Sequence, residues 1–217
     1  MTIRPASDRS LLVCFGDEIS LEAHRQVHRL MMAWGPPRSG ILNLHPAFAS
    51  VLIDFDPRRW SHAEIEAMVR ERISESAPAA PPEPRTIEIP VRYGGEFGPD
   101  LGAVARHTGL TAERVIELHA SAEYLVYFLG FSPGFPYLGG MPPELATPRL
   151  PAPRKSVPAG SVAIGGAQTG IYPMPSPGGW RIIGCTPLQL FDPESDPPAR
   201  LRMGDRLRFV PVPEHRL

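Results

Sequence analysis

The chain has 217 residues, of which 42% are hydrophobic and 21% charged, and its net charge is -1 with histidine counted as neutral. This balance favours neither a nucleic-acid partner nor an anionic membrane surface. No apolar run approaches the roughly 20 residues that span a bilayer, and the first ten residues lack the apolar stretch of a secretory signal. The two cysteines, Cys14 and Cys185, form no CxxC pair. We therefore expect a soluble cytoplasmic protein.

Proline is the outlier of this composition, with 28 residues beside 20 glycines. Because both are interleaved with Val, Ile, Leu and aromatic residues, they indicate an ordered, loop-rich β protein rather than disorder. The densest stretch is SAPAAPPEPR, Ser76 to Arg85, which has no apolar periodicity. Such a segment is typical of a stiff linker. The predicted organisation is a domain at 1–75, a proline-rich linker at 76–85 and a second domain at 86–217.

The first domain has an α/β pattern. Ser20 is an N-cap candidate for a helix that runs to Trp34, with apolar residues at helical spacing. Ser61 and Glu64 form an S-x-x-E capping box at the start of a second helix. Strand-like runs occur at LLVCF, GILNL and SVLIDF. The order β-α-β-β-α predicts a small sheet with helices on one side, ferredoxin-like in outline.

The second domain opens with TIEIPV, a strand by alternation, followed by two short helices that end near Gly109 and Ser121. After Ser121 no helical period recurs. Short β-type runs separated by turn residues are typical of a closed barrel or a compact sandwich. In the first run, EYLVYFLG, the residues on both alternating sides of the strand are apolar, which indicates a strand buried on both faces. The runs are EYLVYFLG, SVAIGG, TGIYP, WRIIG, PLQLFD and DRLRFV.

The stretch GFSPGFPYLGG, Gly130 to Gly140, is too apolar for a flexible linker and too broken for a helix or strand. Its prolines fix φ, and its glycines permit positive φ or close backbone approach. Two interpretations stay open. The segment is either a structural plug at one end of the barrel or a rigid wall, including Phe135, that contacts a small ligand or a partner chain.

His119 follows Val115 by four positions on the second short helix, so it faces inward near the start of EYLVYFLG. One interpretation is a core histidine hydrogen-bonded to a backbone carbonyl. The other is a side chain that lines a pocket beside Gly130–Gly140, where its pKa range suits acid–base work.

Arg149, Arg154 and Lys155 lie among prolines in PRLPAPRKSVPAGS. A guanidinium held there would present a fork to a carboxylate or phosphate, whereas solvated surface charge is the alternative. Gln168, Tyr172 and Trp180 follow in a glycine-rich stretch whose backbone N–H groups are candidates for an anion or oxyanion nest. These glycines are Gly165, Gly166, Gly170, Gly178 and Gly179.

Several known catalytic and nucleotide-binding motifs are missing from the sequence. There is no GxxxxGK[ST] and no GxGxxG in a βαβ unit, so we do not expect this chain alone to hold the phosphates of ATP. G-x-S-x-G and HExxH are also missing. The seven histidines and two cysteines show no zinc spacing, so no metal is predicted. His24 and His28 are expected on the polar side of the first helix.

Three long segments carry a specific resemblance: VIELHASAEYLVYFLGFSPGFPYLGG, LATPRLPAPRKSVPAGSVAIGGAQTGIYPMPSPGGWRIIGCTPLQLFD, and MGDRLRF. They closely resemble the family of B-type 5-oxoprolinase subunits, also labelled Kip inhibitor or allophanate hydrolase subunit 1. The module is similar to part of the carboxyltransferase domain of urea carboxylase. The resemblance covers nearly the whole chain.

The resemblance implies an N-terminal α/β domain and a C-terminal cyclophilin-like β-barrel. It also implies partners, namely a homologous C-type subunit and a subunit of lactam-utilisation type. Together such chains hydrolyse 5-oxoproline, a lactam, to glutamate with ATP, which we expect the complex rather than this chain alone to bind. This chain departs from the family pattern at GCTP, where Cys185 replaces an arginine found in many members. The role of that arginine is either lost here or taken by Arg181.

From the residues and the resemblance together we expect a site with two sets of side chains. His119 is the acid–base candidate, and Arg154 is the first choice to bind the acid group of the substrate. The expected catalytic residues are His119, Arg154, Gln168 and Tyr172; the expected substrate-binding residues are Tyr124, Phe135, Arg149, Gly165, Gly166, Gly178, Gly179 and Trp180.

Two other functions stay open at this stage. A protein inhibitor of a sensor histidine kinase would use Gly130–Gly140 as a docking surface. A carboxyltransferase-type subunit acting on urea or allophanate would need a separate biotin carrier, because the chain has no MKM-type biotinylation site.

Overall fold

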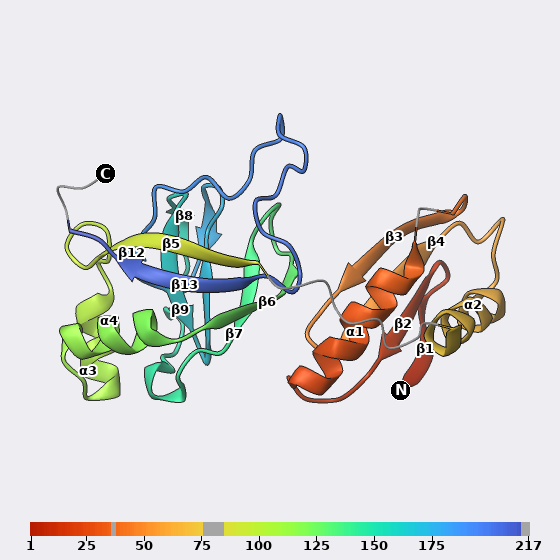
Figure 1. The fold of residues 1–217 in the computed structure, drawn as a ribbon, viewed down its shortest axis with the longest axis horizontal. Coiled ribbons are helices and arrows are strands. Elements are labelled where there is room, and N and C mark those ends of the chain that lie inside the picture. The colour runs from red at the N-terminus through yellow and green to blue at the C-terminus, as the bar shows by residue number, and fades with distance from the viewer. Residues whose placement is uncertain (36–37, 76–84, 214–217) are drawn as a thin grey trace. The chain divides into compact units, whose positions relative to one another are not determined.

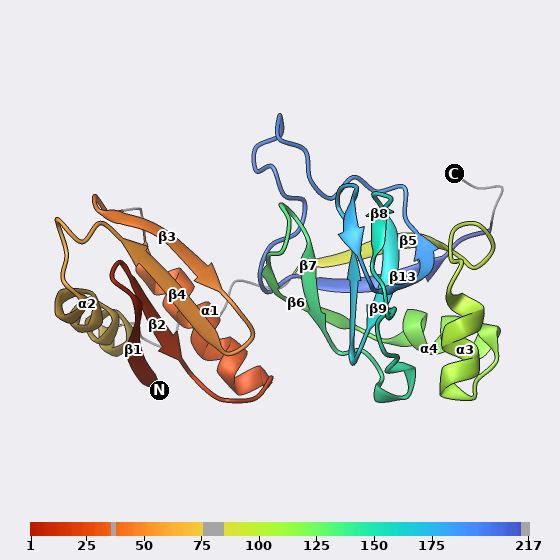
Figure 2. The same ribbon diagram turned by 180° about the vertical axis from the view of Figure 1, so that it is seen from behind.

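The computed structural model describes residues 1–35, 38–75 and 85–213, which divide into two compact units, Met1–Glu83 and Pro84–Leu217. The predicted linker at 76–85 falls outside the described residues except for Arg85. Figure 1 labels most of the elements, and Figure 2 shows the same ribbon from behind.

The first unit is a four-stranded antiparallel sheet in the order β1-β2-β4-β3. Its two helices pack against each other and cover one face of the sheet (Figures 1 and 2). The sequence elements are β1 Thr2–Ser7, β2 Ser10–Cys14, α1 Leu21–Trp34, β3 Ile41–Pro46, β4 Ser50–Phe55 and α2 His62–Glu75.

Both predicted helix starts are confirmed. The Ser20 hydroxyl accepts from the backbone N–H of Ala23 at 3.1 Å. At the second helix, the backbone N–H of Ser61 donates to Glu64 Oε2 at 2.8 Å, and the N–H of Glu64 donates to Ser61 Oγ at 3.3 Å. These reciprocal bonds satisfy N–H groups that have no partner within the helix.

Two features of the first unit differ from the expectation. Strand β1 was not predicted, because this exposed edge strand contains Pro5 and shows no apolar alternation. The order is therefore β-β-α-β-β-α, whereas a ferredoxin-like unit runs β-α-β-β-α-β, so that outline is not confirmed. His24 is 5% exposed and not on a polar face.

The second unit is mainly β, with a closed barrel in the order β10-β7-β6-β13-β5-β12-β9 and a two-stranded ribbon of β8 and β11. Its elements in chain order are β5 Thr86–Tyr93, α3 Leu101–Thr108, α4 Ala112–Ser121, β6 Tyr124–Leu129, β7 Pro136–Gly139, the 3-10 turn η1 Pro143–Leu145, β8 Arg154–Val157, β9 Ser161–Gly165, β10 Gln168–Ile171, β11 Ser176–Gly178, β12 Arg181–Cys185 and β13 Arg206–Pro211.

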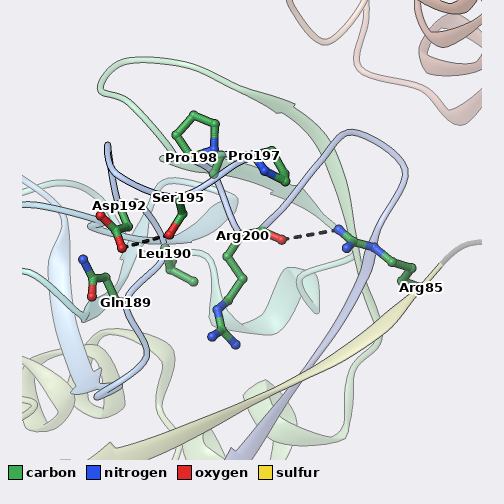
Figure 3. A pocket seen from close by; sticks show the side chains of 9 residues that line it. Arg85, Gln189, Leu190, Asp192, Ser195, Pro197, Pro198 and Arg200 are labelled. Carbon is green, nitrogen blue, oxygen red and sulfur yellow. Dashed lines mark hydrogen bonds between the residues drawn. The ribbon is translucent and has the colours of Figure 1, made fainter.

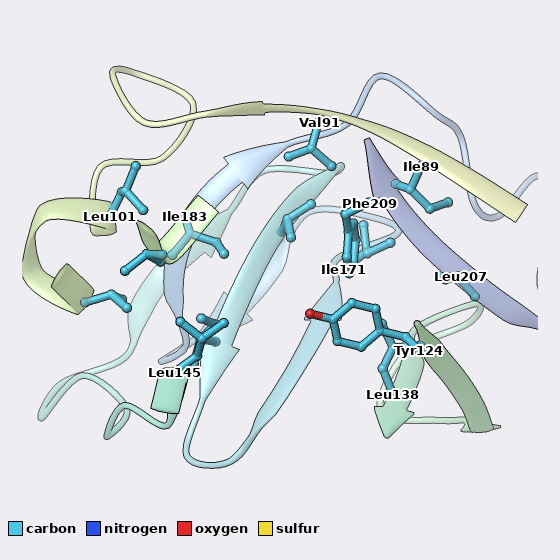
Figure 4. Close-up of a cluster of buried hydrophobic side chains, with 14 of the residues drawn as sticks. Ile89, Val91, Leu101, Tyr124, Leu138, Leu145, Ile171, Ile183, Leu207 and Phe209 are labelled. Atoms are coloured by element: carbon cyan, nitrogen blue, oxygen red, sulfur yellow. The ribbon is translucent and has the colours of Figure 1, made fainter. Parts of the chain in front are cut away.

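The barrel is filled by apolar side chains that point inward from every wall, as Figure 4 shows. Strand β13 closes the structure because it pairs in parallel with β5 and antiparallel with β6. Helix α4 packs against β13, and α3 packs against β12. The side chains labelled in Figure 4 are Ile89, Val91, Leu101, Tyr124, Leu138, Leu145, Ile171, Ile183, Leu207 and Phe209.

The strand predictions were partly wrong here. PLQLFD forms no strand and contributes only the isolated bridge between Phe191 and Ala199. Conversely, the second half of Gly130–Gly140 is strand β7, which pairs with β6 and β10. Pro136 begins that strand, where its missing N–H is tolerated, so composition alone hid it.

Candidate functional site

A second apolar cluster lies outside the barrel interior and contains three of the predicted site residues, Phe135, Tyr172 and Trp180. The ribbon of β8 and β11, in which Gly178 lies opposite Arg154, borders this cluster. Val157 belongs to β8, and Ala163 and Ile182 belong to the neighbouring barrel strands β9 and β12. The cluster comprises Phe135, Val157, Ala163, Tyr172, Trp180 and Ile182, with Tyr137 packed against them.

Phe135 is the centre of this cluster and is only 2% exposed. Its ring makes edge-to-face contacts with Tyr137, Tyr172 and Trp180, at centroid separations of 5.3, 5.4 and 5.7 Å. This geometry aligns positive ring edges with negative ring faces. A fourth ring, Phe131, contacts Phe135 at 5.4 Å and is 64% exposed. The cluster therefore runs from a buried centre to the surface.

The glycines of this region make room for the aromatic rings. A Cβ on Gly165 would lie 2.6 Å from three atoms of the Trp180 indole, and a Cβ on Gly178 would collide with the Tyr172 hydroxyl. Gly170 would meet Phe135 at 2.9 Å. Close approach to aromatic side chains thus explains these glycines without an oxyanion nest.

Gly165→Ala is expected to lower the free energy of unfolding by about 2 kcal/mol, because the new methyl group must displace Trp180 from a well-packed site. Urea unfolding followed by Trp fluorescence measures the change. Gly179→Ala is the matched control, since its Cβ would come no closer than 3.8 Å to any neighbour. Equal stability losses in both variants would show that Trp180 does not set the requirement at Gly165.

Gly166, one glycine of the expected anion-binding nest, has no free backbone N–H group. The N–H of Gly166 donates to the Thr147 carbonyl at 2.8 Å, and Thr147 donates back to Gly166 at 3.0 Å. Gln168 lies at the start of β10, paired with Gly165 across a tight hairpin. Gly166 is therefore a turn residue, with φ +64°, rather than a donor to a ligand.

Two arginines border the aromatic cluster. Arg154 Nη2 donates to Asp100 Oδ1 at 2.9 Å, while Asp100 Oδ2 accepts from the backbone N–H of Ile182 at 2.7 Å. Arg154 Nη1 is buried and has no hydrogen-bond partner among the described residues. The guanidinium of Arg149 lies 5.6 Å from the centre of the Trp180 ring, a cation–π distance.

Tyr172 lies within the field of both arginines. Burial raises the pKa of its hydroxyl, while a hydrogen bond from the Trp180 backbone and the charges of Arg149 and Arg154 act in the opposite direction. The phenol is therefore a neutral group beside two cations. Together, these groups can donate to an anionic oxygen, as in a carboxylate.

His119 and Tyr124 do not join this cluster. His119 is 0% exposed inside the barrel, where its ring contacts Tyr124 and Phe209 at 5.4 and 4.4 Å. Tyr124 is also 0% exposed, and its hydroxyl donates to the His119 carbonyl at 2.8 Å. The expectation that His119 lines a pocket, and Tyr124 a substrate site, is not supported, because the inward face of α4 is the barrel core itself.

Hydrogen bonds fix His119 in one neutral form. Thr169 Oγ1 donates to the Ala163 carbonyl at 3.1 Å, so it accepts from His119 Nε2–H at 2.9 Å. Nδ1 therefore accepts from the Tyr93 hydroxyl at 2.8 Å. Every polar atom of the ring is satisfied without a charge, and burial lowers the pKa of His119 to about 3.

This arrangement gives a pH dependence with a definite sign. Because the pKa of His119 is about 3 in the folded chain and about 6.5 when unfolded, the unfolded chain binds the proton first as pH falls. The stabilisation is complete above pH 6.5 and is lost progressively toward pH 3. Between pH 7.5 and 4.5 the chain should lose about 3 kcal/mol more than His119→Ala, as measured by urea unfolding. Parallel losses would contradict the neutral assignment.

The cysteine in the GCTP segment lies on β12, directly opposite Arg92 of β5. Cys185 is half-buried, and burial raises the pKa of its thiol, whereas Arg92 acts to lower it. Arg181 lies at the other end of β12, and its Nε donates to the Pro148 carbonyl at 3.2 Å. Arg92 is thus the cation next to Cys185, a neighbour that the sequence did not reveal.

A cavity of about 340 Å³ lies elsewhere on the second unit and was missed from the sequence (Figure 3). Its walls come from Arg85 and the segment 189–200, which shows no periodic pattern. Ser195 Oγ donates to Asp192 Oδ2 at 2.9 Å, and Arg85 Nε donates to Asp205 Oδ1 at 3.0 Å. The lining residues are Arg85, Gln189, Leu190, Asp192, Ser195, Pro197, Pro198, Ala199 and Arg200.

Within 1–35, 38–75 and 85–213, no group of three or more His, Cys, Asp or Glu side chains comes together as a metal site. No helix in this part of the chain has the length and apolarity to cross a membrane.

Comparison with known proteins identifies the family. The profile of a family described as "Carboxyltransferase domain, subdomain C and D" matches residues 1–201. The chain belongs to this family. The chain is similar to the B-type 5-oxoprolinase subunit of Bacillus subtilis, with 44% identity over 98% of this chain and 93% of that protein. The Escherichia coli O157:H7 protein of the same name is 60% identical over 69% of each chain. The resemblance stated from the sequence is confirmed.

Solved structures agree with this family assignment. The crystal structure of TTHA0988 is 41% identical, with a TM-score of 0.83 over 94% of this chain, which spans 40% of that longer chain. The Kluyveromyces lactis urea amidolyase is 23% identical, with a TM-score of 0.79 over 99% of this chain and 15% of its own length. At this identity, the similarity to urea amidolyase shows a shared fold and nothing more.

Proposed function

We propose that this chain is a subunit of an ATP-dependent 5-oxoprolinase, which opens 5-oxo-L-proline to L-glutamate together with partner subunits. The observation that carries the proposal is the 44% identity to the B-type 5-oxoprolinase subunit of Bacillus subtilis across 98% of this chain. The partners are a homologous C-type subunit and a lactam-utilisation type subunit, assembled in the cytoplasm. As part of this proposal, we assign the barrel of the second unit to the cyclophilin-like type that the family resemblance implies.

Arg154 binds the carboxylate of the lactam. Asp100 holds one terminal nitrogen of the guanidinium at 2.9 Å, which leaves buried Nη1 without a partner among the described residues. The Tyr172 hydroxyl supplies a further donor at the same cluster. Trp180 and Phe135 provide apolar faces for the ring methylene groups of the substrate.

The amide of the lactam is resonance-stabilised, so its opening benefits from activation by ATP. The N–H groups of Gly160 and Gly166 are not free to bind a phosphate, because they donate to the Tyr172 and Thr147 carbonyls. We assign ATP to a partner subunit. The acid–base role expected of His119 is not part of the proposal, since its ring is buried and fully bonded.

Reconstitution tests this function. Glutamate release from 5-oxoproline and ATP is measured with all three purified subunits and again with each one left out. We expect release only from the complete mixture. An inactive complete mixture, or full activity without this chain, would contradict the proposal.

The family description supports one second candidate, a carboxyltransferase-type subunit acting on urea or allophanate. Transfer of labelled carboxyl groups from a biotinylated carrier distinguishes it from lactam hydrolysis. No observation on the described residues favours the histidine-kinase inhibitor.

A further inference from the structure

Phe131 combines exposure with an unusual backbone conformation. Its side chain is 64% exposed, and its φ of +65° is the only positive value among the described residues other than glycine. The N–H of Ser132 donates to the Gly130 carbonyl at 2.7 Å, so Phe131 occupies the centre of a three-residue γ-turn of the rare, strained hand. A bulky residue in this region is a genuine outlier.

The surrounding segment holds this turn in place. The N–H of Gly130 donates to the Phe135 carbonyl, and the N–H of Phe135 donates to the Ser132 carbonyl, both at 3.0 Å. Gly134, at φ +79°, approaches so closely that a Cβ would lie 2.9 Å from Phe191. The Phe131 ring rests edge-on against buried Phe135 at 5.4 Å. The ring is therefore presented in a fixed direction.

Neither the exposed side chain of Phe131 nor its positive φ stabilises the isolated chain. Left-handed backbone at a bulky residue costs free energy and persists where the surroundings impose it, which is common at functional sites. An exposed phenyl ring on a rigid support matches the aromatic anchors of protein interfaces, whose binding is favoured because little conformational freedom is lost.

We propose that Phe131 is the anchor of a docking surface for a partner subunit of the same enzyme complex. The partner offers an apolar socket for the ring. Contacts link Phe131 through Phe135 and Trp180 to exposed Arg149, so the socket has a carboxylate at its rim. The relatives are named as subunits, and in TTHA0988 this region is 40% of a longer chain, which keeps a further region attached to it. The partner's identity rests on the proposed function.

The test measures binding of this chain to each purified partner subunit, and the melting temperature (Tm) of this chain alone. Phe131→Gly removes the ring and relieves the positive φ, and Phe131→Asn removes the ring but tolerates that φ. We expect both variants to bind one partner at least about 30-fold more weakly, while Tm stays level or rises. Leu42→Ser, which alters a 60% exposed side chain of the first unit, is the control and should keep the parental Kd.

The outcomes separate this inference from the proposed function. Parental affinity of both Phe131 variants for both partners would overturn the docking surface, even with reduced glutamate release, which would place Phe131 in the substrate cleft. Equal weakening by Leu42→Ser would also overturn it. Weakened binding of the Phe131 variants supports docking even where the complete mixture proves inactive on 5-oxoproline.

Discussion

Replacing Arg154 by methionine is expected to lower kcat/KM of the reconstituted complex for 5-oxoproline by about 100-fold. Methionine keeps much of the apolar stem but removes every donor, and a charge-assisted pair with a carboxylate contributes about 3 kcal/mol. The Arg154 side chain is 30% exposed, and Asp100 binds only one of its terminal nitrogens. Steady-state kinetics with varied 5-oxoproline measure the effect, which should appear mainly in KM because the carboxylate is bound before and during the reaction.

Lys155→Met is the matched control. Lys155 is exposed and follows Arg154 on β8, where alternation directs it to the opposite face, so its loss should leave kcat/KM nearly unchanged. Arg154→Met also leaves Asp100 without its ion pair, which should lower the free energy of unfolding by about 1 kcal/mol. Assays well below Tm remove that contribution. Similar kinetic losses in both variants would indicate a general charge effect rather than a specific site.

Replacing His119 by alanine is expected to lower the free energy of unfolding by about 3 kcal/mol while leaving kcat of the folded complex nearly unchanged. The change opens a cavity next to Tyr124 and Phe209 and removes the partner of the Tyr93 hydroxyl. Urea unfolding at pH 7.5 measures the stability, and glutamate release at low temperature measures the rate.

His107→Ala provides the comparison for this variant. His107 is an exposed histidine on the neighbouring helix α3, so its removal should change stability by less than about 0.5 kcal/mol. A large fall in kcat with normal stability for His119→Ala would restore the acid–base role and contradict the structural one.

Local signals accounted for much of the fold. The caps at Ser20 and Ser61 appear in the structure as hydrogen bonds within one helical turn, and Gly109 ends α3 with φ +72°. Such features depend on residues three or four positions apart, so the sequence displays them directly.

Elements held by distant partners were harder to predict. β1 is an exposed edge that β2 alone holds in place, and β8 and β11 pair only with each other across some twenty residues of chain. Their short sequences have no apolar period, and β1 and β11 each contain a proline. Only the tertiary pairing makes them strands, since strand preference depends strongly on context.

Five of the predicted site residues lie in one region, whereas His119 lies apart from them inside the barrel. Arg149, Arg154, Phe135, Tyr172 and Trp180 do come together. His119 was grouped with them because helical spacing shows that a side chain faces inward, but not whether the interior is a pocket or a core. The glycines were misassigned for a related reason: the rings that need their space come from distant strands.

The carboxylate assignment is tested most directly by comparing 5-oxoproline with 2-pyrrolidinone, the same lactam without its carboxyl group. The ratio of the two kcat/KM values is measured for complexes containing the parent chain and Arg154→Met. If Arg154 binds the carboxylate, the variant should lose activity on 5-oxoproline and keep its rate on 2-pyrrolidinone, so the ratio falls by about 100-fold. An unchanged ratio, with both substrates slowed equally, would contradict the assignment.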